Sequence, residues 1–148
     1  MRPTATARSG FTLIELLLVI GIILLLAGLV VPQFIGQQQQ AQIDTTRIAV
    51  HSFEQALDIY RMNAGAYPTT EQGLAALLAP PTSEPIPQKW VGPYLKEGST
   101  LQDPWQNVYQ YAYPGTYNQT KPDIWSAGPD RQSGTADDIG NWLQQPAQ

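Results

Sequence analysis

FTLIELLLVIGIILLLAGLVV, residues 11–31, is an apolar run in which Glu15 carries the only charge. As an α-helix rising about 1.5 Å per residue, it would reach about 30 Å, the hydrocarbon thickness of a bilayer. The alternative is an ordinary secretory signal peptide, but such a peptide ends in a small-x-small cleavage site, and this run continues into Pro32 instead. We therefore expect residues 11–32 to form a membrane-spanning helix that stays in the mature chain.

The charges around this run predict its orientation. Arg2 and Arg8 precede it, whereas the next basic residue is Arg47. Because basic residues are retained on the cytoplasmic side, the N-terminus is expected in the cytoplasm and everything from Gln33 onward outside it.

Glu15 is the unusual residue of the run, because a carboxylate inside a bilayer costs on the order of a few kcal/mol unless it is paired. Two interpretations are open on physical grounds. Either a cation pairs with the carboxylate, or the side chain extends to the headgroups.

The motif GFTLIE, residues 10–15, resembles the processing site of type IV pilins and of type II secretion pseudopilins. The resemblance implies that a prepilin peptidase cuts between Gly10 and Phe11, removes residues 1–10 as a leader and methylates the new terminal amine. It also implies that Glu15 meets the terminal ammonium of a neighbouring subunit and so sets the register of a filament.

Residues 33–64 are expected to continue the helix outside the membrane. Pro32 should kink or open it locally, because proline lacks an amide hydrogen and crowds the preceding turn. Beyond it lies one apolar stripe with a heptad spacing, formed by Ile43, Thr46, Val50, Phe53, Leu57 and Tyr60. The stripe would suit a coiled-coil dimer, but packing against strands of the same domain is preferred because the heptads are few. Asn63 and Gly65 can end the helix.

Residues 65–148 read as a globular region that begins with a second short helix. Thr69 or Thr70 can cap this helix, Gln72 completes a capping box, and its buried side is formed by Leu74, Leu77 and Leu78. The following segment, residues 82–98, contains three prolines, so we expect an irregular loop and a candidate contact surface.

Strand signals follow this loop. Residues 108–113 alternate with Tyr109, Tyr111 and Tyr113 on one side, and Ile124 with Trp125 suggests a second strand. Each of these elements has one apolar side that must be buried. We therefore expect an α+β fold in which the long helix packs on a small antiparallel sheet. YPTTEQGL, residues 67–74, and DPW, residues 103–105, extend the pilin-like resemblance to major pseudopilins of type II secretion.

Residues 126–142, SAGPDRQSGTADDIGNW, form an acidic, glycine-rich segment. Asp130, Asp137 and Asp138 would repel one another if they converged, and Ca²⁺ accepts such oxygen ligands in loose geometry. The spacing is not that of an EF-hand, so a solvated acidic turn stays an equal alternative on spacing alone.

The same segment is similar to the calcium loop of major pseudopilins, through S-x-G-x-D, G-T-x-D-D-I and N-W. The resemblance implies a structural Ca²⁺ held by Asp130, Asp137 and Asp138, with backbone oxygens near Trp125, Ser126 and Ile139. Arg131 stands where that family commonly has glycine, so a left-handed backbone there would be strained.

Composition excludes several classes of function. The 148-residue chain has no cysteine, so it has no disulfide and no thiolate chemistry. After Val31 there are six basic residues (8 − 2) and eleven acidic ones (12 − 1), a balance of −5 that argues against nucleic-acid binding. His51 has no catalytic partner set, and Asp137 and Asp138 are adjacent rather than opposed as in a tethered hydrolase.

The resemblance therefore implies a structural subunit, not an enzyme: one that forms the periplasmic filament, the pseudopilus, which drives protein export across the outer membrane in type II secretion. The expected location is the inner membrane, which the chain would cross once, with its C-terminal domain in the periplasm. Its expected partners are copies of itself, the prepilin peptidase, minor pseudopilins and inner-membrane secretion components. A minor pseudopilin or a type IV pilin subunit is the alternative.

Overall fold

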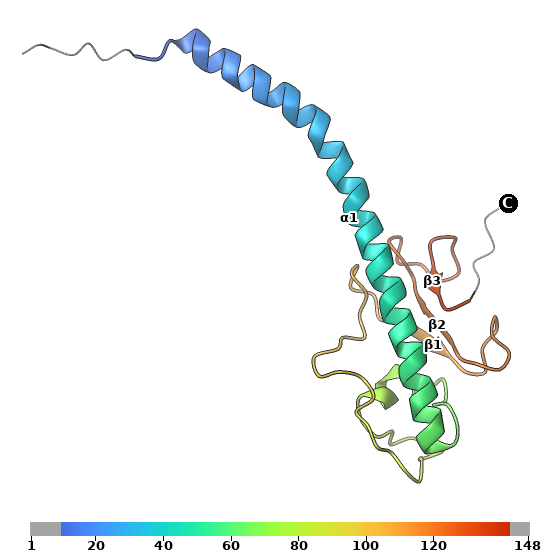
Figure 1. Ribbon diagram of the computed structural model, residues 1–148. Helices are drawn as coiled ribbons and strands as arrows, with labels where there is room; N and C mark the ends of the chain where they lie inside the picture. Colours follow the sequence, from blue (N-terminus) through green and yellow to red (C-terminus); the bar gives the residue numbers. More distant parts are fainter. Residues whose placement is uncertain (1–9, 143–148) are drawn as a thin grey trace, which may run out of the picture. The chain divides into compact units, whose positions relative to one another are not determined.

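The computed structural model of the chain describes residues 10–142, except for the side chains of residues 27–35. The elements are α1 (Leu13–Ala64), the 3₁₀ helix η1 (Leu74–Leu77), and the strands β1 (Gln110–Ala112), β2 (Asp123–Ser126) and β3 (Ile139–Gly140) (Figure 1). The chain divides into two units between Gln40 and Ala41, so α1 contributes to both.

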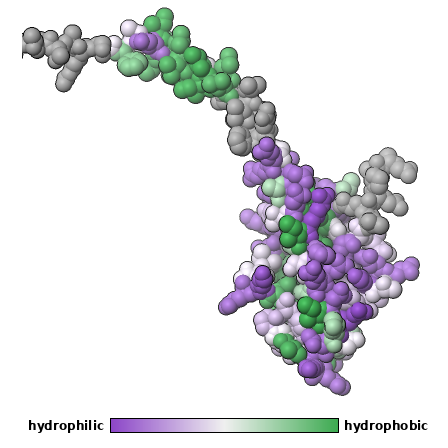
Figure 2. Space-filling model, in the orientation of Figure 1, coloured by the Kyte–Doolittle hydropathy of each residue, from purple (hydrophilic) through white to green (hydrophobic). Residues whose placement is uncertain are grey.

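The N-terminal unit is the first part of α1. Thr12 caps the helix, because its hydroxyl accepts a hydrogen bond from the Glu15 amide and Glu15 Oε2 accepts one from the Thr12 amide. The large apolar residues from Phe11 to Leu26 are all exposed, and they form the green surface of this segment in Figure 2. Helical backbone continues through Pro32, so proline does not interrupt α1. Within the described residues, no helix satisfies the combined length and hydropathy needed to cross a bilayer.

The core of the C-terminal unit is built on the predicted stripe of α1. Thr46, Val50, Phe53, Leu57 and Tyr60 are all buried, whereas Ile43 at the start of the stripe is only half-buried. The helix ends as predicted at Gly65, whose φ of +87° needs a residue without a Cβ and whose amide donates to the Arg61 carbonyl at 2.8 Å.

The second helix is shorter than predicted. The capping box does form, with the Gln72 amide 3.2 Å from Thr69 Oγ1 and the Thr69 amide 3.1 Å from Gln72 Oε1. It caps only a turn, because Gly73 has a φ of +57° that breaks α-helical geometry. The chain then continues as η1, with Leu74 and Leu77 buried and Leu78 exposed, so the prediction of an α-helix with three buried leucines was wrong.

The sheet has the order β1-β2-β3, and both pairs are antiparallel. The strand predicted for residues 108–113 is confirmed over its centre, where Tyr111 faces Ile124 across the β1–β2 ladder. Of the tyrosine row, Tyr109 and Tyr111 are buried while Tyr113 is partly exposed. The Tyr109 ring packs edge-on against Phe53 of α1 at 4.9 Å between centroids, which joins the sheet region to the helix.

Residues 82–98 form the irregular loop that the prolines predict, and hydrogen bonds join this loop to Gln72 and Ala76. Gln72 Nε2 donates to the carbonyls of Ser83 and Pro85, at 2.7 Å and 3.0 Å. Trp90 Nε1 donates to the Ala76 carbonyl at 2.9 Å, and the Trp90 and Tyr94 rings meet edge-on at 5.7 Å. The loop is irregular but fixed.

Candidate functional site

The predicted processing site lies ahead of α1. Gly10 and Phe11 belong to irregular backbone, a Cβ at Gly10 would have no atom within 4 Å, and Phe11 is 85% exposed. Glu15 lies in the first turn, where its Oε2 accepts hydrogen bonds from the Thr12 amide and the Thr12 hydroxyl at 3.1 Å and 3.0 Å. The bond at which cleavage is predicted is therefore sterically open, and the Glu15 carboxylate is oriented by its own helix cap.

The predicted acidic loop connects β2 to β3, and its carboxylates bind the loop's own donors. Asp137 Oδ2 accepts from the Asp130 amide at 3.1 Å, and Asp137 Oδ1 accepts from the Thr135 hydroxyl at 2.6 Å. Asp138 Oδ2 accepts from the Gly134 amide at 2.7 Å. Asp130 and Asp137 are thus brought together, while the Asp138 carboxylate is bonded to another part of the loop.

Two backbone positions give this loop its shape. Gly128 has a φ of +64°, and a Cβ there would lie 2.4 Å from the Asp137 carbonyl oxygen, so the two limbs of the loop touch at a position that only glycine fits. Arg131 has a φ of +61°, which confirms the left-handed backbone expected at this departure from the family pattern.

The carboxylates also affect one another's protonation. Burial raises the pKa of Asp138, and the negative charges of Asp137 and Asp130 raise it further. The pKa of Asp137 is lowered, mainly by the hydrogen bond from the Thr135 hydroxyl and against a smaller effect of burial. The loop therefore concentrates negative charge in a small volume.

The arrangement suits a metal ion only in part. Carboxylate oxygens are the ligands that Ca²⁺ prefers, and the Asp130, Asp137 and Asp138 side chains share one loop. Across residues 10–142, however, no three His, Cys, Asp or Glu side chains gather in a way that could hold a metal ion. Of the predicted backbone ligands, Ser126 and Ile139 lie opposite each other in the β2–β3 ladder, and Trp125 faces Gly140.

Sequence reasoning missed the residues that anchor the acidic loop. Asp103, 5% exposed, accepts hydrogen bonds from the Asn107 amide (2.8 Å), the Asn107 side chain (2.9 Å) and the Ser126 hydroxyl (2.5 Å). Asn107 Nδ2 also donates to the Gly128 carbonyl at 3.1 Å, and the Gly128 amide donates to Ser126 Oγ at 3.0 Å. The available signal was the spacing of Asp103 and Asn107 on either side of Pro104.

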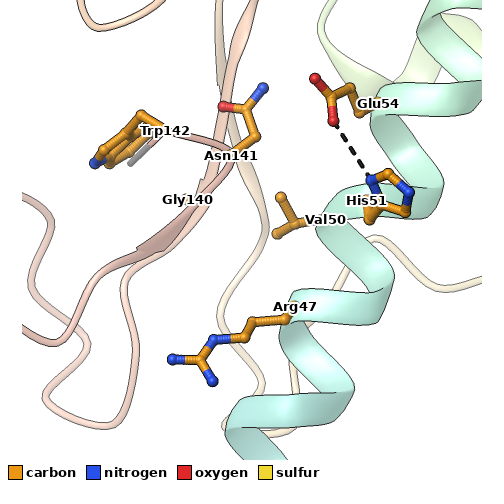
Figure 3. A pocket seen from close by; sticks show the side chains of 7 residues that line it. All are labelled: Arg47, Val50, His51, Glu54, Gly140, Asn141 and Trp142. Carbon is orange, nitrogen blue, oxygen red and sulfur yellow. Dashed lines mark ion pairs between the residues drawn. The ribbon is translucent and has the colours of Figure 1, made fainter. Parts of the chain in front are cut away.

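A groove of about 280 Å³ lies between α1 and β3 (Figure 3). Arg47, Val50, His51 and Glu54 line it from the helix, while Gly140, Asn141 and Trp142 line it from the sheet. His51 Nδ1 lies 3.5 Å from Glu54, which also pairs with Lys121 at 3.2 Å. His51 thus pairs with Glu54, and none of the residues that line the groove is a nucleophile beside it.

A capped N-terminal helix with an acid in its first turn, joined to a second unit with a small antiparallel sheet, defines the chain as a pilin-like subunit. The prokaryotic N-terminal methylation motif matches residues 6–31, and the model of type II secretion system protein G matches residues 33–142. The chain belongs to the type II secretion system protein G family. It is a structural pseudopilin and not an enzyme.

Similar proteins share most of the chain. The type II secretion system core protein G of Aeromonas hydrophila is 46% identical over 136 residues, covering 91% of this chain and 92% of that protein. The Pseudomonas aeruginosa core protein G is 43% identical over 139 residues, covering 91% and 95%. The crystal structure of the major pseudopilin of enterohaemorrhagic Escherichia coli superposes with a TM-score of 0.65 at 40% identity, covering 76% of this chain and 92% of that one.

Proposed function

We propose that this chain is the major pseudopilin of its secretion system and polymerises into a periplasmic filament whose growth drives proteins across the outer membrane. The observation that carries the proposal is the exposed apolar surface at the start of α1. Large apolar residues from Phe11 to Leu26 are between 45% and 85% exposed, far more than an isolated water-soluble helix tolerates. Such a surface is stable against lipid in the membrane and against other copies in a filament.

In this proposal residues 11–32 cross the inner membrane once, with the N-terminus in the cytoplasm and the C-terminal unit in the periplasm. The basic residues Arg2 and Arg8 support that orientation. The prepilin peptidase cuts between Gly10 and Phe11 and methylates the new amine, and the exposure of both residues supports access to the bond. Minor pseudopilins and inner-membrane secretion components are the further partners.

Glu15 sets the register of assembly in this proposal by pairing with the Phe11 ammonium of a neighbouring copy. The carboxylate needs such a cation because its hydrogen bonds with Thr12 do not neutralise its charge. We predict that Glu15→Gln is cut and methylated normally but forms no filaments. Mass spectrometry of the mature chain would measure the first part, and electron microscopy of filaments sheared from overproducing cells the second.

Thr12→Val is the matched control for Glu15→Gln, because it removes the capping hydroxyl and keeps the carboxylate. It should be processed and should assemble. Filaments of Glu15→Gln at the wild-type yield would disprove the register argument, and a mature chain that begins at any residue other than Phe11 would disprove the processing site.

We propose, in addition, that a structural Ca²⁺ braces the loop between β2 and β3. Asp130, Asp137 and Asp138 would hold it, with backbone oxygens near Trp125, Ser126 and Ile139. The negative charges of Asp137 and Asp130, which add to the effect of burial in raising the pKa of Asp138, support this proposal. When bound, the ion would offset the repulsion among the carboxylates and order a loop that the core does not cover.

Asp137→Ala tests the calcium proposal, since Asp137 joins the two limbs of the loop. The full chain in detergent should melt at a higher temperature with Ca²⁺ than with chelator, by an amount that corresponds to about 2.7 kcal/mol when the free ion is 100 times its Kd. Asp137→Ala should melt at one temperature in both conditions, and Mg²⁺ should not replace Ca²⁺. A wild-type melting temperature that chelator leaves unchanged would remove the proposal.

A further inference from the structure

Asn141 and Trp142 directly follow β3, and neither is among the proposed ligands of the metal ion. The side chains of both contact loop 113–122, the segment that joins β1 to β2. We propose that Asn141 is a positioning residue that joins this loop to the acidic loop, residues 127–138, so that Ca²⁺ bound in the acidic loop also orders loop 113–122. This inference rests on the proposed Ca²⁺ site.

Loop 113–122 is built around one buried carboxylate. Asp123, 2% exposed, accepts hydrogen bonds from the amides of Thr116, Tyr117 and Asn118, at 2.5 Å, 2.8 Å and 2.9 Å. Asn118 Nδ2 donates to the same carboxylate at 2.9 Å. Three consecutive amides therefore have a protein acceptor instead of water, and hydrogen exchange at these amides reports whether the loop is ordered.

Asn141 joins this arrangement to the start of β2. Its Oδ1 accepts hydrogen bonds from the Ile124 amide at 3.1 Å and from Asn118 Nδ2 at 3.2 Å, and its Nδ2 donates to the Pro122 carbonyl at 3.0 Å. The Asn141 amide donates to the Ile124 carbonyl at 3.0 Å. One side chain thus fixes the end of β3 against both β2 and loop 113–122.

Trp142 provides a second connection, which begins in the acidic loop. Ser133 of that loop accepts a 2.6 Å hydrogen bond from Trp125 Nε1, and the Trp125 ring meets the Trp142 ring at 5.9 Å between centroids. The Trp142 ring points away from α1 (Figure 3) and stacks on Tyr117 at 4.2 Å. The acidic loop and loop 113–122 are therefore connected through side chains as well as through β3.

The proposed ligands place the ion close to Asn141 along the chain. Asp138 and Ile139 are separated from Asn141 by Gly140 alone or by one further residue. Repulsion among the acidic side chains opposes the position of this limb, and a bound Ca²⁺ would offset that repulsion. Hydrogen bonds weaken steeply when their angles change, so the bonds of Asn141 depend on the position of β3. Asn141 would thus act through β3, without touching the ion.

The effect would extend to α1. Lys121, in loop 113–122, pairs with Glu54 of α1 at 3.2 Å. Because an exposed ion pair contributes little stability by itself, this contact depends on the order of the loop that carries it. Ca²⁺ in the acidic loop would therefore also favour the attachment of loop 113–122 to the helix.

Amide hydrogen exchange of the full chain in detergent, measured by mass spectrometry with Ca²⁺ and with chelator, tests the inference. In the wild type, chelator should speed exchange at residues 116–118 about tenfold, together with exchange in the acidic loop. In Asn141→Ala, residues 116–118 should exchange fast in both conditions, while the acidic loop still responds to Ca²⁺. A merely structural role of Asn141 would instead speed exchange and keep the difference between the two conditions.

Asn118→Ala is a second variant, which removes the bond to Asn141 from the side of the loop and leaves the bonds of Asn141 to Ile124 and Pro122 in place. It should also abolish the response of residues 116–118 to Ca²⁺. Asn63→Ala is the matched control, because it makes the same chemical change on α1, outside both loops, and it should respond like the wild type.

The outcomes separate this inference from the Ca²⁺ proposal. A chelator effect in the acidic loop without one at residues 116–118 would overturn the inference and leave the Ca²⁺ site standing. A response to Ca²⁺ at residues 116–118 that persists in Asn141→Ala would overturn it as well. Exchange that chelator leaves unchanged in both loops would contradict the Ca²⁺ site and, with it, the inference.

Discussion

Asp103 is the residue on which the geometry of the acidic loop depends. Its buried carboxylate accepts hydrogen bonds from Asn107 and from the Ser126 hydroxyl. We predict that Asp103→Asn lowers the free energy of unfolding by about 2 kcal/mol, because the amide brings a donor to a site where only donors face it. Urea denaturation of the full chain in detergent, followed by tryptophan fluorescence, would measure the loss.

Asp44→Asn is the appropriate control for Asp103→Asn. It makes the same chemical change at an exposed ion pair, where Asp44 lies 3.4 Å from Arg47, and should cost less than about 1 kcal/mol. If the two variants were equally stable, the network around Asp103 would not anchor the loop.

At the scale of the elements, regular patterns were predictable and local exceptions were not. The buried stripe of α1 follows from heptad spacing, and the helix end follows from Gly65, because both depend on residues close in sequence. The second helix was mispredicted because the positive φ of Gly73 outweighs a capping box that does form. Strand β3 is two residues long, too short for any alternation to show.

The candidate site shows the same division between local and distant information. Its carboxylates were predicted from residue type and from family resemblance. The left-handed backbone at Arg131 was expected because arginine stands there in place of the family's common glycine. The bond that anchors the loop joins Ser126 to Asp103, 23 residues away, and no local pattern specifies such a pair. Side-chain hydrogen bonds between distant residues depend on the finished fold.

Loop 82–98 is the element whose order depends most on one side chain. Gln72 is 8% exposed and donates to the Ser83 and Pro85 carbonyls. We predict that Gln72→Leu leaves α1 intact but speeds amide hydrogen exchange in the loop about tenfold, since two carbonyls lose their donor. Mass spectrometry of exchanged peptides would show this. Gln88→Leu, in the exposed part of the same loop, should change exchange little, and equal effects of both variants would contradict the role of Gln72.

On the scale of the whole C-terminal unit, tyrosines connect the helix, the loop and the sheet. Tyr60 of α1 meets Tyr94 of the loop at 5.3 Å between ring centroids, and Tyr67 meets Tyr113 at 5.2 Å. The Tyr111 hydroxyl donates to the Pro68 carbonyl at 2.7 Å inside the core. Because Tyr60, Tyr67 and Tyr111 are buried where the elements join, ionisation of their phenols would affect the whole unit.

Alkaline pH should therefore unfold the C-terminal unit through these tyrosines. Burial raises the pKa of Tyr67 and of Tyr109 to about 12, and it also raises the pKa of Tyr111. Phenols in an unfolded chain ionise near pH 10, as a rough reference, so above that pH the unfolded state binds fewer protons than the folded state, and stability falls as pH rises. We predict that the urea concentration at the unfolding midpoint of the full chain decreases as the pH is raised from about 10 to about 12.

Tyr109→Phe should make this decline shallower, because one phenol no longer titrates, whereas Tyr117→Phe should not, because Tyr117 is exposed. A midpoint that stays constant up to about pH 12 would show that the buried phenols do not control the stability of the unit.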